Sequence, residues 1–153
     1  MKIDTTRFGV LEVPEEEVVE FSRGLFGFED IDRYVLLDHR PGSPFRWLQA
    51  VGRPDLAFVV MDPREFCSHY DFDIPEEDGL VLKSSDGEGL QVLVVVGIPD
   101  DPVEMTANLK GPILINAVRR IGRQIVLPGD QYSPRFRIVD GIRMAKDRTA
   151  VSE

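Results

Sequence analysis

Leu90–Ile98, with the sequence Leu-Gln-Val-Leu-Val-Val-Val-Gly-Ile, is the stretch that decides the fold. Its β-branched residues favour a strand. Polar residues hardly interrupt it, whereas a strand with one face in water alternates between apolar and polar residues. We therefore expect a strand at Leu90–Ile98 with both of its faces covered by other parts of the chain.

Short apolar runs separated by turn-forming residues continue on both sides of this stretch. The expected strands are Thr6–Val13 (a pair with a turn near Gly9), Val18–Phe21, Tyr34–Leu37, Trp47–Val51, Leu56–Met61, Met105–Leu109, Ile113–Asn116 and Gln124–Leu127. Gly122 and Pro128–Gly129 are expected to bound the last of these strands. About ten short strands favour a closed or nearly closed antiparallel sheet, in a small barrel or sandwich, because closure removes exposed edges.

Helix signals are few. Asp62–Phe66 starts with a capping residue followed by proline, which predicts a short helix, and Glu29–Arg33 has room for one turn. We predict an all-β, mainly antiparallel fold, a small β-barrel-like single domain over residues 1–140 with one or two short helices. Residues 141–153 are expected to form a charged C-terminal tail that is disordered or helical.

Size and composition are those of one soluble domain. The chain has 153 residues, of which 42% are hydrophobic and 29% charged, and this length buries a core without disulfides. Its one cysteine, Cys67, allows no internal disulfide. No apolar stretch approaches the ~20 residues that span a bilayer, and Met1–Asp4 has no apolar signal-peptide core. We therefore expect a cytoplasmic protein that makes no contact with a membrane.

The formal net charge of −9 is unevenly distributed. Residues 1–104 contain 9 Lys and Arg and 23 Asp and Glu, a net charge of −14, whereas residues 105–153 contain 9 and 4, a net charge of +5. Phosphate binding needs a basic surface, so the overall charge argues against direct nucleic-acid binding. The asymmetry instead indicates two surfaces, one suited to basic partners and one neutral or basic.

No pattern of residues indicates a catalytic site, a metal site or a cofactor site. The two histidines, His39 and His69, lack the spacing of zinc ligands, and no base stands at a recognisable offset from Cys67. Gly24–Glu29 has two glycines but neither the ending of a Walker motif nor the third glycine of a dinucleotide loop. The sequence therefore predicts no catalytic residue, metal or cofactor.

Gly24–Glu29 instead predicts a tight turn in which the glycines adopt positive φ. Leu25, Phe26 and Phe28 carry a large apolar surface within this turn. Either they plug one end of a barrel, or one or two of them stay exposed and anchor a partner.

Besides Glu15–Glu17, which follow Pro14 in an expected exposed turn, acidic residues gather in two Pro-containing segments. The first contains Asp71, Asp73, Glu76, Glu77 and Asp78, and the second contains Asp100, Asp101 and Glu104. Paired carboxylates perform acid–base chemistry in shaped pockets, but these lie in expected loops, where solvated acids merely keep a protein soluble. The alternative interpretation is an acidic face that meets a basic protein.

Asn108 and Asn116 stand inside otherwise apolar, strand-like runs. A buried amide side chain must find hydrogen-bond partners. We therefore expect each asparagine to brace a neighbouring stretch of backbone.

Several motifs occur in the order and at the spacing of one protein family. They are Gly24–Glu29, Pro44–Gln49, Leu56–Phe58 with Asp62–Pro63, Met105–Leu109, Gly111–Ile113 with Ile115–Asn116, and Gln124–Leu127 with Tyr132. Through these motifs the chain resembles the flagellar assembly factor family FliW over residues 1–138. No single motif is a catalytic signature, so the specificity of the resemblance comes from the ensemble.

The resemblance implies a function that composition does not reveal. Proteins of the FliW family are non-enzymatic β-barrels that bind flagellin in the cytoplasm. They also bind CsrA, a basic RNA-binding dimer that represses translation of flagellin mRNA. Free flagellin occupies the family protein and leaves CsrA to repress, whereas export of flagellin returns the protein to CsrA and translation resumes. The resemblance thus implies flagellin and CsrA as partners, no cofactor, no direct nucleic-acid or membrane contact, and a monomer when free.

The acidic and apolar segments are the candidate sites for these partners. We hypothesise that the carboxylates dock beside the RNA-binding surface of CsrA and repel RNA phosphates. An apolar groove is expected to receive a helical end of flagellin. The candidate residues are Asp71, Asp73, Glu76, Glu77, Asp78, Asp100, Asp101, Phe26, Phe28, Phe45, Met105 and Asn108.

Two other functions compete with this interpretation. A small β-barrel hydrolase needs at least two carboxylates that converge in a pocket. Direct RNA binding needs a basic surface, and the overall acidity of the chain limits it. The arginines available for RNA binding are Arg119, Arg120, Arg123, Arg135 and Arg137.

Overall fold

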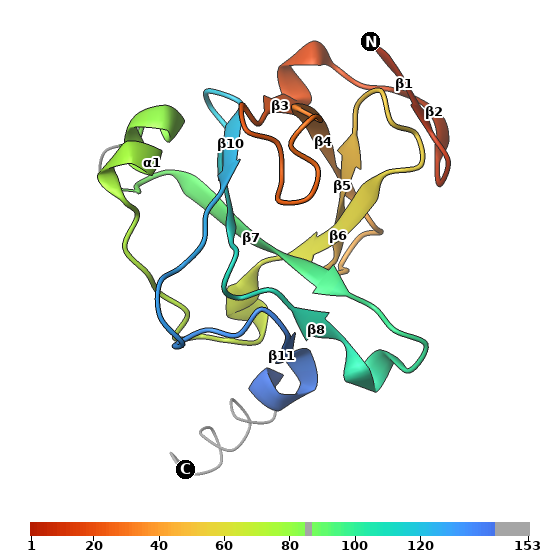
Figure 1. The fold of residues 1–153 in the computed structure, drawn as a ribbon. Helices are drawn as coiled ribbons and strands as arrows, with labels where there is room; N and C mark the ends of the chain where they lie inside the picture. Colours follow the sequence, from red (N-terminus) through yellow and green to blue (C-terminus); the bar gives the residue numbers. More distant parts are fainter. Residues whose placement is uncertain (85–86, 143–153) are drawn as a thin grey trace.

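The computed structural model describes residues 1–84 and 87–142, and its centre is a closed barrel of seven strands (Figure 1). These are β3 (Val18–Glu20), β4 (Arg33–Asp38), β5 (Arg46–Ala50), β6 (Ala57–Met61), β7 (Leu90–Gly97), β9 (Ile113–Asn116) and β10 (Ile121–Gln124). They join in the order β7, β6, β5, β4, β3, β10, β9, and β9 pairs back to β7. All neighbours are antiparallel except β10 and β3. The predicted β-barrel is confirmed.

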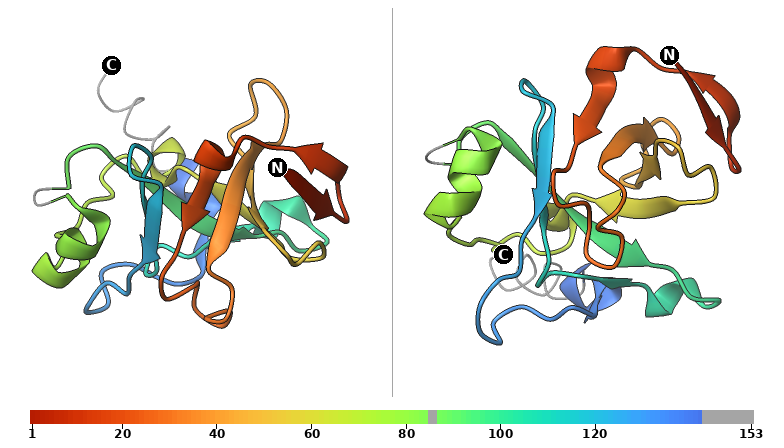
Figure 2. Two further views of the ribbon diagram at one scale, coloured as in Figure 1. Left: turned by 90° about the horizontal axis from the view of Figure 1, so that it is seen from above. Right: turned by 45° about the horizontal axis from the view of Figure 1, so that its top comes forward.

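Smaller elements surround the barrel. The hairpin of β1 (Lys2–Thr5) and β2 (Gly9–Glu12) and the helix α1 (Glu76–Leu82) lie on opposite sides of it (Figure 2). The short strands β8 (Thr106–Ala107) and β11 (Phe136–Arg137) extend the sheet from β7. Single 3₁₀ turns occur at η1 (Glu15–Glu17), η2 (Pro63–Glu65) and η3 (Pro102–Glu104), and residues 138–142 are helical.

The side chains of β7 alternate between two apolar cores. Leu93 and Val95 belong to the core inside the barrel, whereas Val94 and Val96 belong to an outer core. Residues 62–84 and 125–142 cover this outer core with side chains such as Phe66, Tyr70, Leu82, Leu127 and Ile138. The N-terminal hairpin covers a third cluster, which contains Ile3, Val13, Val18 and Val35. The prediction that both faces of Leu90–Ile98 are covered is confirmed.

The N-terminal hairpin lies earlier in the chain than its predicted position at Thr6–Val13. Residues 6–8 form the turn rather than a strand. The hydroxyl of Thr5 explains this, because it accepts a hydrogen bond from the Phe8 backbone and donates one to the Gly9 carbonyl, both at 2.8 Å. Gly9, with φ of +69°, then starts β2.

The last barrel strand also differs from the prediction of Gln124–Leu127 bounded by Gly122. Gly122 lies inside β10. The ring of Phe21 packs directly against it, and a Cβ atom at this position would stand 2.4 Å from that ring. The barrel closes here through a single parallel register pair, Ile121 with Glu20. The side chain of Gln124 connects β10 to neighbouring segments by two hydrogen bonds. Its Oε1 accepts from the Phe26 backbone at 2.9 Å, and its Nε2 donates to the Gly111 carbonyl at 2.9 Å.

The helix predictions were partly right. At Asp62–Phe66, the Asp62 side chain accepts a hydrogen bond from the Arg64 backbone at 2.9 Å and starts η2. Glu29–Arg33 is not helical: residues 29 and 30 form a turn, and Arg33 starts β4. The predicted strand Met105–Leu109 shortens to β8, because η3 precedes it and Asn108 turns the chain toward Gly111.

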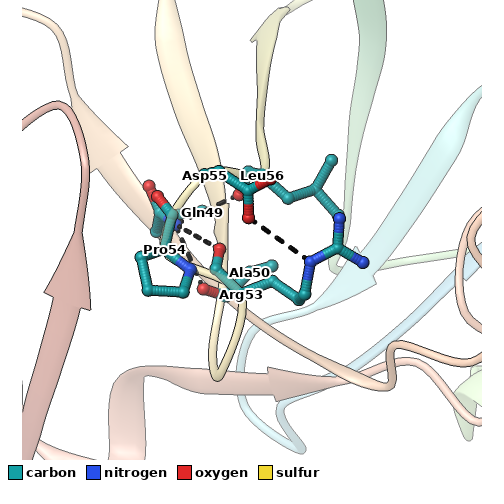
Figure 3. Close-up of polar contacts among 6 residues, drawn as sticks. All are labelled: Gln49, Ala50, Arg53, Pro54, Asp55 and Leu56. Carbon is teal, nitrogen blue, oxygen red and sulfur yellow. Dashed lines mark hydrogen bonds and ion pairs between the residues drawn. The ribbon is translucent and has the colours of Figure 1, made fainter.

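Gln49, within the Pro44–Gln49 motif, has a structural role (Figure 3). Its fully buried side chain donates from Nε2 to the carbonyls of Ala50, Arg53 and Leu56 at 3.2, 3.2 and 3.1 Å. These bonds fix the turn between β5 and β6. Arg53 donates to the Asp55 carboxylate at 3.4 Å, and this hydrogen bond holds the pKa of Asp55 below its ordinary value.

Candidate partner-binding surfaces

The described residues contain no arrangement typical of a metal site. Within residues 1–84 and 87–142, no group of three or more His, Cys, Asp or Glu is placed to hold a metal ion. His39 and His69 are exposed. No helix in the described part of the chain is long and apolar enough to cross a membrane. Two tyrosines have a raised pKa because of burial: that of Tyr34 rises to about 12, and that of Tyr70 rises as well.

The first acidic segment is not the continuous loop that the sequence predicts. Pro75 precedes α1, and Glu76, Glu77 and Asp78 occupy its first turn. Carboxylates are favourable there because the helix dipole places partial positive charge at the N-terminus. The segment therefore divides into an extended part with Asp71 and Asp73 and a helical part.

Asp78 faces the barrel. Its Oδ1 lies 2.6 Å from Nε of Arg123 on β10, and the two side chains are only 15% and 7% exposed. The neighbouring Glu77 lies 3.8 Å from the same guanidinium and 3.3 Å from that of Arg23. The expectation that Asp78 belongs to an exposed acidic loop was wrong, because helical periodicity turns it inward.

Asp71, Asp73 and Glu76 remain exposed, and none forms an ion pair with another described residue. We call them the α1-side acidic surface. Tyr132 fixes the start of this surface, because its hydroxyl accepts from the Asp71 backbone N–H and donates to the Asp71 carbonyl, each at 3.0 Å. Tyr132 also contacts Tyr70, whose hydroxyl donates to the buried Leu109 carbonyl at 2.6 Å.

The second acidic segment lies in the loop between β7 and β8, away from α1 (Figures 1 and 2). Asp100 and Asp101 are exposed, and Asp101 caps η3 by accepting from the Val103 backbone at 3.1 Å. Ile98 and Val103 expose 53% and 55% of their surface in the same loop. The two acidic segments therefore do not form one continuous acidic surface.

In the Gly24–Glu29 turn, two apolar side chains pack into the protein and one is exposed. Gly24 and Gly27 have φ of +61° and +88°, as predicted. Leu25 is 2% exposed, and Phe28 packs edge-on against Phe58 with ring centroids 5.2 Å apart. Phe26 is 49% exposed and is the candidate anchor.

The remaining candidate residues are more buried or have structural bonds. Phe45 and Met105 are largely buried and pack against the outer core. Asn108 accepts from the Gly111 backbone at 3.0 Å, and Asn116 donates to the Leu82 carbonyl at 2.8 Å. The predicted bracing by both asparagines is confirmed. Sequence reasoning missed the exposed residues Leu80, Ile98, Val103 and Val126, because isolated apolar residues carry no pattern.

The sequence model of the FliW protein family matches residues 2–138. The chain belongs to the FliW family. The flagellar assembly factor FliW of Thermoanaerobacter pseudethanolicus is 42% identical over 146 residues, which cover 95% of this chain and 97% of that protein. The one from Geobacter sulfurreducens is 38% identical over 146 residues, covering 95% and 91%.

A crystal structure of the flagellar assembly factor FliW has the same fold. It superposes with a TM-score of 0.83 at 31% sequence identity and covers 90% of this chain and 96% of that chain. Membership of the FliW family supports a role in flagellar assembly and confirms the resemblance found in the sequence.

The five arginines considered for RNA binding do not share one surface in this FliW-family chain. Arg119 and Arg120 lie in the turn between β9 and β10, whereas Arg123 is buried beside Asp78. Arg137 on β11 pairs with Glu104 at 3.2 Å and with Asp140 at 3.8 Å. This dispersal removes the continuous basic stripe on which that reading depends.

Proposed function

We propose that this FliW-family chain is a non-enzymatic flagellar assembly factor of the cytoplasm that binds flagellin and CsrA alternately. Binding of CsrA relieves its repression of flagellin translation, and free flagellin reverses this by occupying the chain. The observation that carries the proposal is the α1-side acidic surface, whose three carboxylates are exposed and without ion pairs among the described residues. Such carboxylates are free to attract a basic protein.

Electrostatics explain how this surface opposes RNA. Carboxylates that dock beside the RNA-binding surface of a basic dimer attract its cations and repel the phosphates of an approaching RNA. The Coulomb attraction of one exposed pair of charges is about 1 kcal/mol at contact distance in water, and the ordering of the side chains reduces its net contribution to roughly 0.5 kcal/mol. Physiological salt screens the attraction over about 8 Å. The antagonism should therefore weaken as salt concentration rises.

Neutralising the α1-side acidic surface tests the CsrA arm. The triple variant Asp71→Asn, Asp73→Asn and Glu76→Gln is expected to weaken CsrA binding about tenfold at low salt, since each exposed charge pair contributes roughly 0.5 kcal/mol. Calorimetry with purified CsrA measures this. In a gel shift with flagellin leader RNA, the native chain alone gives no shift and abolishes the shift by CsrA, and the triple variant abolishes it less.

The matched control for this variant removes three exposed acids elsewhere. Asp4→Asn, Glu16→Gln and Asp32→Asn change the net charge by the same amount, on the N-terminal hairpin, η1 and the segment before β4. This control is expected to retain CsrA affinity. Equal losses in both triple variants, or no loss in either, would remove the α1-side acidic surface from the mechanism.

Flagellin is expected to meet an apolar surface centred on Phe26. Among the four apolar candidates Phe26, Phe28, Phe45 and Met105, Phe26 is the one that is about half exposed. The side chain of Gln124 holds the Phe26 backbone, and Val126, 60% exposed, follows two residues later. An aromatic side chain on a held backbone loses little entropy on binding and suits a helix-in-groove contact.

Phe26→Ala tests this contact. Buried aromatic anchors contribute about 2 kcal/mol or more to protein interfaces, so affinity for purified flagellin is expected to fall about 30-fold in calorimetry, with CsrA affinity unchanged. Val118→Ala, which truncates a side chain that is 89% exposed on the β9–β10 turn, is the control and should bind normally. Native flagellin affinity in Phe26→Ala would exclude Phe26 as the anchor.

A further inference from the structure

A cleft of about 440 Å³ opens where β3 and β10 meet, beside the turn between β9 and β10. Three arginines line it from two parts of the chain: Arg33 at the start of β4, and Arg119 and Arg120 in the turn before β10. Glu15 and Glu20 stand beside them, and Val18 and Ile121 add apolar surface. The cleft lies at the one-pair parallel seam of the barrel.

The guanidinium groups in this cleft have spare donors. Arg33 and Arg119 form no ion pair with any other residue that the structure describes, although the chain has a net charge of −9. Arg120 uses one nitrogen, Nη1, which donates to the Glu15 carbonyl at 3.1 Å. A guanidinium has five N–H donors in a planar fork that matches a carboxylate.

Arg120 also occupies a backbone conformation that favours glycine. Its φ of +58° lies in the left-handed region, which is unfavourable by about 1–2 kcal/mol for a residue with a Cβ atom. Strained residues of this kind concentrate at functional sites, where surrounding bonds hold them in place. Two bonds restrain Arg120: its Nη1 donates to the Glu15 carbonyl, and its own carbonyl accepts from the Glu20 backbone at 2.9 Å.

The charges that line the cleft limit the kinds of anionic group that it can bind. Three arginines and two glutamates leave a formal charge of +1 on these five side chains, and Met1 also lines the cleft, with its ammonium donating to the Val13 carbonyl at 2.7 Å and lying 3.9 Å from the Glu12 carboxylate. The glutamates repel a multiply charged phosphate chain more strongly than a single carboxylate, and a carboxylate matches the planar donors of an arginine. Val18 and Ile121 suit an apolar neighbour of that carboxylate. We propose that this cleft binds a carboxylate-bearing peptide segment of a protein partner. This binding is independent of the flagellin and CsrA contacts proposed above.

A small peptide tests the site on the full-length chain. The probe is acetyl-Ala-Leu-Glu-Leu-Ala-amide, and its matched control carries Gln in place of Glu. In a ¹⁵N NMR titration the Glu peptide is expected to shift the amide signals of Arg33, Arg119 and Ile121, and to bind about tenfold more tightly than the Gln peptide. Equal binding of both peptides, or equal competition by inorganic phosphate, would overturn the proposal.

Arginine variants distinguish peptide binding in the cleft from a general effect of net charge on affinity. Arg33→Gln with Arg119→Gln is expected to weaken the Glu peptide about tenfold or more, and both side chains are exposed, so the fold should persist. Arg40→Gln with Arg135→Gln removes the same charge from exposed positions outside the cleft and should bind normally. An equal loss in both double variants would show that the cleft plays no specific part.

Discussion

Asp78→Ala is expected to lower the free energy of unfolding by about 3–5 kcal/mol, because it leaves a buried cation without its partner. Arg123 is 7% exposed, and its Nε lies 2.6 Å from the carboxylate of Asp78. Among the described residues, the other anion that pairs with it is Glu77, at 3.8 Å from Nη2. That side chain is 73% exposed and shared with Arg23, so it compensates poorly. Urea denaturation followed by tryptophan fluorescence measures the change.

Two further variants make this result specific. Glu76→Ala removes an exposed acid from the same helical turn and is expected to change stability by about 0.5 kcal/mol or less. The double variant Asp78→Leu with Arg123→Met replaces the buried pair with apolar side chains, a change that is often neutral, and should recover most of the loss. A loss below about 1 kcal/mol in Asp78→Ala, or no recovery in the double variant, would contradict this account.

Asp78 also shows why the candidate site was harder to predict than the fold. Five acids within eight residues look alike in the sequence, and Pro75 and Gly79 favour a loop. The helix forms because Pro75 suits its start, and Gly79 is required because a Cβ atom there would stand 2.8 Å from the Ser84 carbonyl. Once α1 exists, its periodicity turns Asp78 toward β10 and leaves Glu76 in water.

The barrel strands were predictable because their signal is local. Leu90–Ile98, Tyr34–Leu37 and Ile113–Asn116 are apolar runs of strand length, and each coincides with a strand of the barrel. The closure itself is not local. It depends on β9 returning to β7 and on the parallel pairing of β10 with β3, which join residues that are far apart in the chain. The sequence therefore left a barrel and a sandwich as alternatives.

The exposure of the aromatic candidates could not be predicted from residue type. Phe26 and Phe28 are two residues apart and chemically identical, yet Phe28 packs on Phe58 while Phe26 is 49% exposed. The backbone bridge between Leu25 and Phe28 sets this difference, since it turns both of these residues toward the core. In the sequence, only the positions of Gly24 and Gly27 indicate such a turn.

Gly24→Ala is expected to destabilise the protein by about 2–5 kcal/mol, because two unfavourable effects add at this position. The φ of +61° is unfavourable for alanine by about 1–2 kcal/mol. In addition, a Cβ atom would stand 2.5 Å from the Phe28 carbonyl oxygen, 2.7 Å from Cα of Glu29 and 2.8 Å from the Ile31 carbonyl oxygen. These are backbone atoms of a closed turn, which cannot move aside as a flexible side chain does, so overpacking adds about 1–3 kcal/mol.

Gly27→Ala, in the same turn, separates strain from collision. Gly27 has φ of +88°, but among the described residues no heavy atom beyond its two chain neighbours lies within 4 Å of a Cβ placed there. About 1–2 kcal/mol of backbone strain is therefore the whole expected effect. Urea midpoints of the two variants and the native chain measure the difference, which should favour Gly27→Ala by at least about 1 kcal/mol. Equal losses would mean that the backbone around Leu25 and Phe28 yields to a methyl group. The turn would then be too soft to hold Phe26 as a rigid anchor for flagellin.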